Sequence, residues 1–197
     1  MQSVVRPREF DRDEVLERAM SVFWSKGFAA TSTSDLVEAM QIGRQSMYDS
    51  FGDKRALYLE ALAQYQQQSV TAHIGRLRSG KTALAGIEAM LAGLAPRDKS
   101  LRHKGCMGVG AIAEFGCDDP DVVKLREKSG AVLVRALTEA VTLAKQQGDI
   151  PPQVGIAESV RFIGTLMMSL QTDARAGVKP EALQATARFS LAALTRR

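Results

Sequence analysis

The sequence predicts an all-α protein, and three observations support this fold class. Apolar residues recur at helical spacing along nearly the whole chain, Gly and Pro divide it into helix-length segments, and no segment alternates as a strand would. A chain of 197 residues with 45% hydrophobic and 24% charged residues can bury a core of its own. We therefore expect a helical protein of one or two domains.

The first third of the chain predicts three short helices followed by a long one. Ser32, with Asp35 three residues later, has the spacing of a capping box that opens the second helix. Asp53 is placed to cap the fourth helix, because Asp is a preferred helix-capping residue. The expected ranges are 11–26, 33–40, 44–50 and 54–78.

The remainder of the chain predicts five further helices, separated by breaks at Gly and Pro. These breaks include Pro96, Gly105, Pro120 and the pair Pro151-Pro152. The expected ranges are 81–95, 104–115, 121–147, 154–176 and 180–195.

The charge distribution does not by itself indicate a nucleic-acid partner. The formal net charge is +4 and the isoelectric point is near 9.2. Residues 1–60 nevertheless hold eight basic against ten acidic side chains, and the basic surplus lies mainly in residues 76–104. Total charge therefore cannot identify the function.

The composition favours the cytoplasm, without a membrane partner. No apolar run reaches the roughly 18 residues of a spanning helix, and the first residues lack an apolar signal core. The two cysteines, Cys106 and Cys117, would lie about 16 Å apart on one continuous helix, too far for a disulfide. We expect both to be free thiols.

Residues 27–57 have the pattern of a helix-turn-helix. Two amphipathic helices flank a short turn that contains Gly43, and the second helix must project to reach a groove. The polar residues of the second helix, Arg44, Gln45, Ser46 and Tyr48, are expected to face outward. The expected core consists of Leu36, Ala39, Met40, Ile42, Met47 and Phe51 with Val22, Phe23 and Phe28.

These residues carry a resemblance to a known family. The chain has Gly27-Phe28, Thr31-Ser32, Asp35-Leu36-Val37 and then Tyr48-x-x-Phe51-x-x-Lys54-x-x-Leu57. From about Phe10 to Leu59 the sequence resembles the TetR family of transcriptional repressors.

The resemblance implies an architecture, a set of partners and a set of DNA-facing residues. It implies a homodimer, with a DNA-binding domain over 1–53 joined by a long helix to a ligand-binding and dimerisation domain over 54–197. The expected partners are a double-stranded DNA operator and an unidentified small-molecule effector, with no cofactor and no metal. The family's DNA-facing positions correspond here to Ser32, Thr33, Ser34, Arg44, Gln45, Ser46, Tyr48 and Lys54.

Side-chain chemistry divides the DNA-facing residues by role. Hydroxyls, helix starts and Lys54 suit phosphates, whereas Arg44 and Gln45 suit guanine and adenine edges. Two departures from the family pattern are notable: Asp49 and Ser50 replace residues that are often aromatic or His, and Gly43 replaces a capping Ser or Thr. The segment Arg6-Pro7-Arg8 is a weaker candidate for minor-groove contact.

The second half of the chain offers candidates for ligand binding rather than a defined site. Apolar side chains in this half suit either an effector pocket or ordinary core packing. The last two expected helices are rich in small and apolar residues, which suits a dimer interface. The pocket candidates include Met90, Met107, Phe115 and Phe162.

Cys106 is a candidate sensor, because Arg102, His103 and Lys104 precede it near an expected helix start. Cationic neighbours favour the thiolate form, which reacts with oxidants and electrophiles. The alternatives are an inert thiol or a cysteine-dependent enzyme with His103 as base. No metal-binding or catalytic motif supports an enzyme, and an all-α protein-interaction module also remains open.

Overall fold

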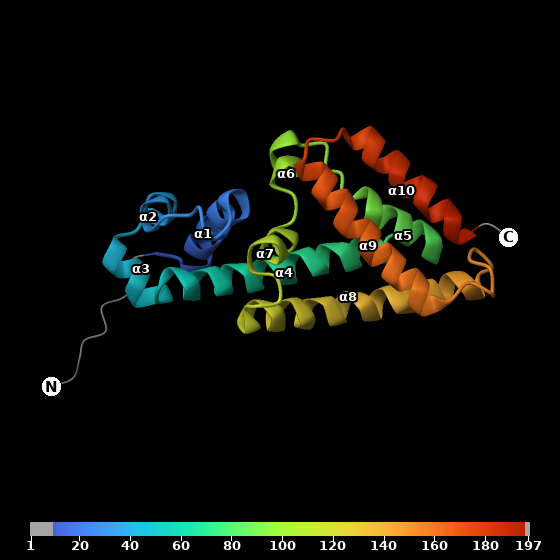
Figure 1. Cartoon of the computed structure of the whole chain (residues 1–197), viewed down its shortest axis with the longest axis horizontal. Helices are drawn as coiled ribbons and strands as arrows, with labels where there is room; N and C mark the ends of the chain where they lie inside the picture. Colours follow the sequence, from blue (N-terminus) through green and yellow to red (C-terminus); the bar gives the residue numbers. More distant parts are fainter. Residues whose placement is uncertain (1–9, 196–197) are drawn as a thin grey trace. The chain divides into compact units, whose positions relative to one another are not determined.

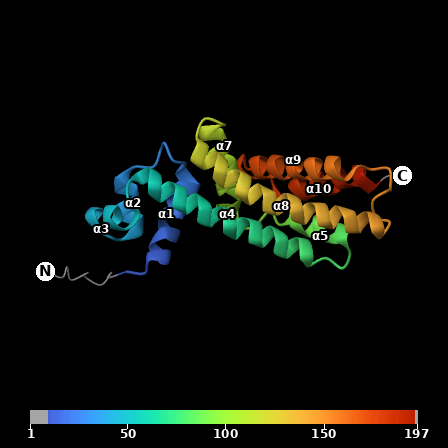
Figure 2. The same cartoon turned by 90° about the horizontal axis from the view of Figure 1, so that it is seen from below.

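The protein is helical throughout the part of the chain that the structure, a computed structural model, describes. This part is residues 10–195, and it contains no strand (Figures 1 and 2). The all-α prediction is confirmed. In chain order the helices are α1 (Arg12–Lys26), α2 (Thr33–Met40), α3 (Arg44–Phe51), α4 (Lys54–Arg78), α5 (Ala83–Ala92), α6 (Lys99–Lys104), α7 (Met107–Phe115), α8 (Pro120–Gln146), α9 (Ile156–Arg175) and α10 (Pro180–Thr195).

One helix was missing from the sequence prediction. Asp98 caps α6 by accepting hydrogen bonds from the amides of Ser100 and Leu101, at 2.7 and 3.4 Å. The helix has six residues and buries none of them, so it has no apolar stripe to detect. The expected helix over 104–115 is also corrected, since Gly105 has a φ of 64° and α7 begins only at Met107.

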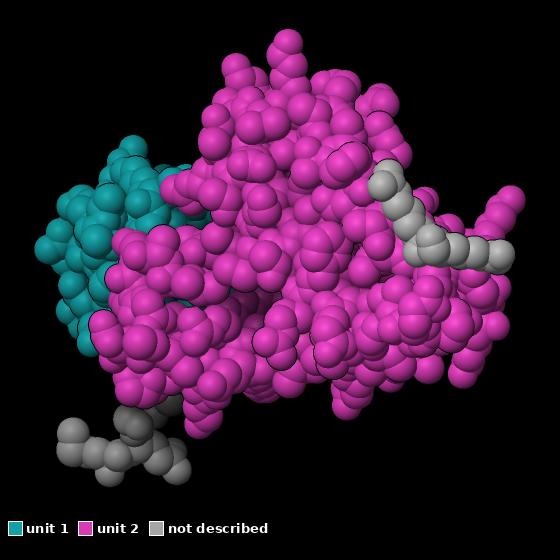
Figure 3. Space-filling model, turned by 45° about the vertical axis from the view of Figure 1, so that its right-hand side comes forward, with its two compact units in different colours: residues 1–64 teal, residues 65–197 magenta. Residues whose placement is uncertain are grey.

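The chain divides into two compact units, Met1–Gln64 and Tyr65–Arg197, coloured separately in Figure 3. The division falls within α4, whereas the sequence placed a domain border at 53/54, where that helix begins. The segment Arg6-Pro7-Arg8 lies outside the described residues. Among the described residues, no helix combines the length and apolar composition needed to cross a bilayer.

The first unit is held together by a small aromatic and aliphatic core. The ring of Tyr58 lies 5.1 Å from that of Phe23 in an edge-on arrangement and 5.0 Å from that of Phe28. Edge-to-face geometry suits the charge distribution of aromatic rings. Most of the expected core is buried, while Val22, Phe28, Ala39 and Ile42 are partly buried. The buried members are Phe23, Leu36, Met40, Met47 and Phe51.

The start of α2 confirms the capping box. Ser32 Oγ accepts from the amide of Asp35 at 3.1 Å, and Asp35 Oδ2 accepts from the amide of Ser32 at 2.9 Å. Lys26 Nζ at the end of α1 donates to Asp35 Oδ1 at 2.7 Å. The bonds from Lys26 and Ser32 lower the pKa of Asp35 to about 2. This carboxylate therefore stabilises the start of α2 and ties it to α1.

The second unit is a ring of four helices around one apolar core. Helix α5 packs against α8 and α10, and α9 packs against the same two helices. Helix α6 packs on α9, while α7 packs on both α8 and α9. Gly86 permits a close approach, because a Cβ there would lie 2.0 Å from the carbonyl oxygen of Leu77. Fully buried members of the core include Ile87, Met90, Leu137, Val141, Ile150 and Ile163.

Candidate nucleic-acid interface

Helix α3 has one buried side and one polar, exposed side. Met47 is fully buried and Phe51 is 5% exposed, so these two side chains anchor the helix in the first unit. Arg44, Gln45 and Tyr48 are exposed, as the sequence predicted, and Ser46 is half-buried. The helix therefore offers hydrogen-bonding groups to a partner on a fixed support.

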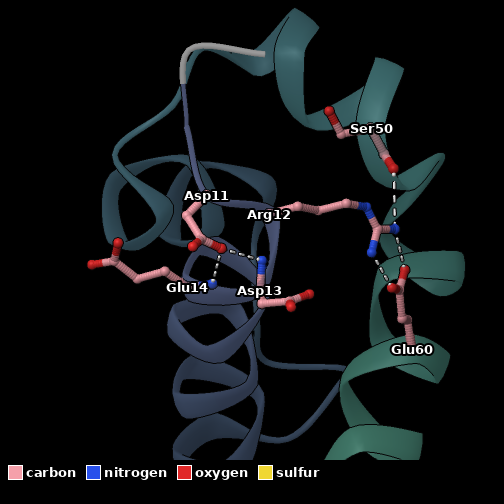
Figure 4. A network of polar contacts seen from close by, with 6 residues as sticks. All are labelled: Asp11, Arg12, Asp13, Glu14, Ser50 and Glu60. Atoms are coloured by element: carbon pink, nitrogen blue, oxygen red, sulfur yellow. Dashed lines mark hydrogen bonds and ion pairs between the residues drawn. The ribbon is translucent and has the colours of Figure 1, made fainter.

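A guanidinium from α1 holds the carboxyl end of α3. Arg12 forms a two-pronged ion pair with Glu60 on α4, at 2.5 and 2.7 Å, and also donates to the carbonyl oxygen of Ser50 at 3.3 Å (Figure 4). Its guanidinium carbon lies 4.5 Å from the centre of the Phe51 ring. Positive charge is favourable at a helix carboxyl end. Sequence reasoning missed Arg12 and Glu60, because they lie 48 positions apart and no motif links them.

Gly43 occupies the capping position directly before α3 and gives the first turn of the helix no side-chain hydrogen bond. Gly43 is one of the two departures from the family pattern that the sequence showed, because a capping Ser or Thr is common at this position. Within the helix, Gln45 Nε2 donates to Asp49 Oδ1 at 2.8 Å, one turn later. Asp49, the other notable departure, is thus exposed on α3 and paired with Gln45.

The other predicted DNA-facing residues also lie in the first unit. Ser32 and Ser34 are exposed and Thr33 is half-buried, all three at the start of α2. The hydroxyl of Ser32 both caps α2 and donates to Asp35 Oδ2 at 2.8 Å. The ammonium of Lys54 lies 4.3 Å from the centre of the Phe28 ring, which orients it at the head of α4.

The four apolar pocket candidates are dispersed through the second unit. Met90 belongs to the four-helix core and Met107 is buried at the start of α7. Phe115 is half-buried, whereas Phe162 is 38% exposed on α9. Two grooves of about 330 and 300 Å³, one beside α5 and α8 and the other beside α5 and α10, are lined by none of these four side chains.

Cys106 occupies the position before the first residue of α7 and is half-buried. The guanidinium of Arg102 donates to the carbonyl oxygens of Pro96 and Arg97, at 2.9 and 3.1 Å. The positive charge of Arg102 is therefore directed toward backbone carbonyl oxygens of the loop before α6. The phenol of Tyr65 forms a side-chain hydrogen bond with the thiol.

Tyr65 begins a row of polar residues on α4, in which Tyr65 and His73 are buried and Ser69 is half-buried. Ser69 hydrogen-bonds to Tyr65, and its Oγ lies 3.1 Å from Nε2 of His73. Burial raises the pKa of Tyr65 and lowers that of His73 to about 4, so both groups are neutral at pH 7. His73 Nδ1 is buried without a hydrogen-bond partner. The spacing of residues 65, 69 and 73 was a detectable helical signal that sequence reasoning missed.

Cys117 lies beyond the opposite end of α7 and is exposed. Its sulfur is 3.8 Å from Oδ1 of Asp118. The two thiols of the chain therefore have different surroundings. Among the described residues, no group of three or more His, Cys, Asp or Glu side chains is arranged to hold a metal ion.

Comparisons with known proteins match both the helix-turn-helix and the whole chain. Residues 15–61 match the model of the bacterial regulatory proteins of the tetR family. The chain is 30% identical to the HTH-type transcriptional regulator YezE of Bacillus subtilis (strain 168), over 96% of this chain and 98% of that protein. It is 28% identical to the HTH-type transcriptional repressor ComR of Escherichia coli (strain K12), over 94% of this chain and 90% of that protein.

A solved structure extends this likeness to the fold. A cysteine mutant of the TetR family transcriptional regulator CifR, complexed with 26-bp double-strand operator DNA, aligns with a TM-score of 0.79 and 32% identity. The alignment covers 95% of this chain and 99% of that one. These relatives are regulators, so the cysteine-dependent enzyme considered from the sequence is excluded. The chain belongs to the TetR family and is a DNA-binding transcriptional regulator.

Proposed function

We propose that the protein is a homodimeric repressor that binds a palindromic operator and is released from it by a small molecule or a thiol-reactive signal. The exposed polar face of α3, supported by buried Met47 and Phe51, is the observation that carries the DNA-binding part. Two such helices would enter successive major grooves about 34 Å apart. That relatives such as ComR are repressors supports the direction of regulation.

The residues on this face divide between reading and positioning. Arg44 and Gln45 carry a forked donor and an amide that suit guanine and adenine edges. Lys54, Tyr48 and the hydroxyls at the start of α2 suit phosphates, which fix the register without reading sequence. Because residues 1–60 are slightly acidic, few phosphate contacts and a modest dependence on salt are expected.

An operator titration tests this division. Arg44→Ala should lower discrimination between operator and mutated operator, because it removes a contact to a base. Lys54→Ala should weaken binding to all duplexes about equally and reduce the salt dependence by about one ion. Uniform weakening by Arg44→Ala, with no loss of discrimination, would contradict the reading role.

We assign dimerisation to α9 and α10, which expose large apolar side chains. Phe162 and Met168 on α9 are 38% and 44% exposed, and Phe189 on α10 is 76% exposed. A second copy of the chain would cover such a face in a two-fold interface. Phe189→Glu should yield a monomer in analytical ultracentrifugation, and an unchanged sedimentation coefficient would exclude this surface.

We assign the thiol-reactive signal to Cys106, on the basis of its contact with Tyr65 at the start of α7. A helix start stabilises the negative charge of an attacking thiolate, and a phenol can donate to it. At neutral pH, Cys106 in the native protein should therefore react faster than a model thiol with a thiol-specific label.

The two single-cysteine variants supply the control. Cys117→Ser leaves only Cys106, and Cys106→Ser leaves only Cys117, which is exposed beside Asp118. Labelling of the first variant should release operator DNA, and labelling of the second should not. If Cys106 reacts no faster than a free model thiol, the signal does not act through it.

A further inference from the structure

Asp49 places a carboxylate on the exposed part of α3, the helix proposed to enter the groove. The side chain is exposed, as are Arg44, Gln45 and Tyr48. Duplex DNA carries about one negative charge per 1.7 Å of its axis. A carboxylate at this position therefore opposes binding to every sequence, unless a base donates a hydrogen bond in return.

The contact between Gln45 and Asp49 turns the two side chains toward each other. Gln45 Nε2 donates to Asp49 Oδ1 at 2.8 Å across one helical turn. The amide nitrogen is thereby held toward Asp49, and the amide oxygen must point elsewhere. A carboxylate has about four acceptor positions, so Gln45 leaves Asp49 able to accept further hydrogen bonds.

The edges of the bases decide which partner can satisfy these acceptors. In the major groove, only adenine N6 and cytosine N4 present donors, while guanine O6 and N7 and thymine O4 are acceptors. Guanine or thymine would thus set an acceptor against a negative charge. In a base pair, the one free N6–H of adenine can donate to the Asp49 carboxylate while adenine N7 accepts the second N–H of the Gln45 amide.

We propose that Asp49 is a specificity-determining residue that, together with Gln45, selects a base with an exocyclic amine at one position of each half-site. It accepts from adenine or cytosine and rejects guanine and thymine. This inference rests on the proposed entry of α3 into the major groove. A pair that served only to stabilise the helix would contribute little, because such pairs are weak.

Selection from a pool of randomised double-stranded DNA tests the proposal in the full-length protein. Wild type, Asp49→Ala and Asp49→Asn are compared, with Arg44→Ala as the control on the same helix. Wild type should favour adenine or cytosine over guanine or thymine at one position by about tenfold. Asp49→Ala should lose that preference and bind the whole pool more tightly, because a negative charge is removed.

Asp49→Asn gives the signature that a structural role would not produce. Its amide can donate as well as accept, so guanine and thymine, whose O6 and O4 accept a hydrogen bond, should no longer be rejected at this position. Arg44→Ala should change the preference at a different position and leave this one intact. Circular dichroism and thermal melting of each variant confirm that the comparison is made on folded protein.

Two other outcomes would overturn the inference, and they differ from each other. If Asp49→Ala and wild type enrich the same bases with the same ratios, Asp49 does not determine specificity, and the enriched bases are read by other residues of α3. If wild type enriches no sequence from the pool, α3 does not read bases, and the proposed function fails together with the inference.

Discussion

The two units use polar side chains in opposite ways. In the first unit, α3 keeps Arg44, Gln45 and Tyr48 exposed, and the apolar Met47 and Phe51 hold the helix in place. In the second unit, α4 carries a polar row in which Tyr65 and His73 are buried and Ser69 between them is half-buried. An exposed polar face adds little to stability and is available to a partner, whereas a buried polar row ties stability to hydrogen bonding and protonation.

This contrast shows how differently the two units respond to change. Substitution of an exposed polar residue on α3 should alter recognition with little effect on the fold. Substitution or protonation in the buried row of α4 should alter the fold itself.

Met47→Ala should destabilise the first unit by about 2–5 kcal/mol, because it opens a cavity under α3. Tyr48→Ala, at the next position but 40% exposed, should cost less, about 1 kcal/mol of unfolding free energy. Urea denaturation of both variants measures the difference. Equal losses in the two variants would mean that α3 is not anchored on one side.

His73 should make the second unit sensitive to mild acid. Its pKa is about 4 in the folded protein against an ordinary 6.5, so the unfolded chain binds the proton first. The stability is complete above pH 6.5 and falls by about 2–3 kcal/mol as the pH drops from 6.5 to 4. His73→Gln should flatten that part of the stability profile, and a wild-type slope in this variant would place the titration elsewhere.

Arg12→Ala should cost the first unit about 1 kcal/mol, since its ion pair with Glu60 is partly exposed. Arg12→Lys keeps the charge but cannot form the two-pronged contact, and should recover only part of the loss. A double-mutant cycle with Glu60→Gln isolates the pair from the contact of Arg12 with Phe51. A coupling energy near zero would mean that packing alone holds the carboxyl end of α3.

Asp35 should respond to acid in a separate and lower window. Its pKa is about 2 in the folded protein against an ordinary 3.8, so its contribution is present above pH 3.8 and is lost as the pH falls to 2. Asp35→Asn should remove this small acid transition without changing the one between pH 6.5 and 4. Amide NMR of α2 can follow the first transition and the imidazole signal of His73 the second.

The sequence predicted local features better than contacts between distant residues. The capping box at Ser32, the end of α2 at Gln41 and the outward face of α3 depend on neighbours three or four positions away. The ion pair of Arg12 with Glu60 joins residues 48 positions apart, and only the folded chain brings them together.

The second unit shows a different limit of sequence reasoning. Met90 and Phe162 were grouped by apolar character, but one lies in the core and the other is exposed. Apolar character alone does not tell a buried side chain from an exposed one, because Phe162 lies outside the buried stripe of α9 although it is as apolar as the residues within that stripe. The row at 65, 69 and 73 had regular spacing, and its polarity concealed that Tyr65 and His73 are buried.

Because α3 has no side-chain cap, the protection of its first amides from solvent exchange should differ between the free protein and its complex with DNA. Gly43 supplies no acceptor for the amides of the first turn, and a phosphate oxygen is a suitable one. Hydrogen–deuterium exchange at Gln45 and Ser46 should therefore slow when a duplex binds. Gly43→Ser has room for its side chain, and would protect these amides in the free protein, so that the duplex would add less protection.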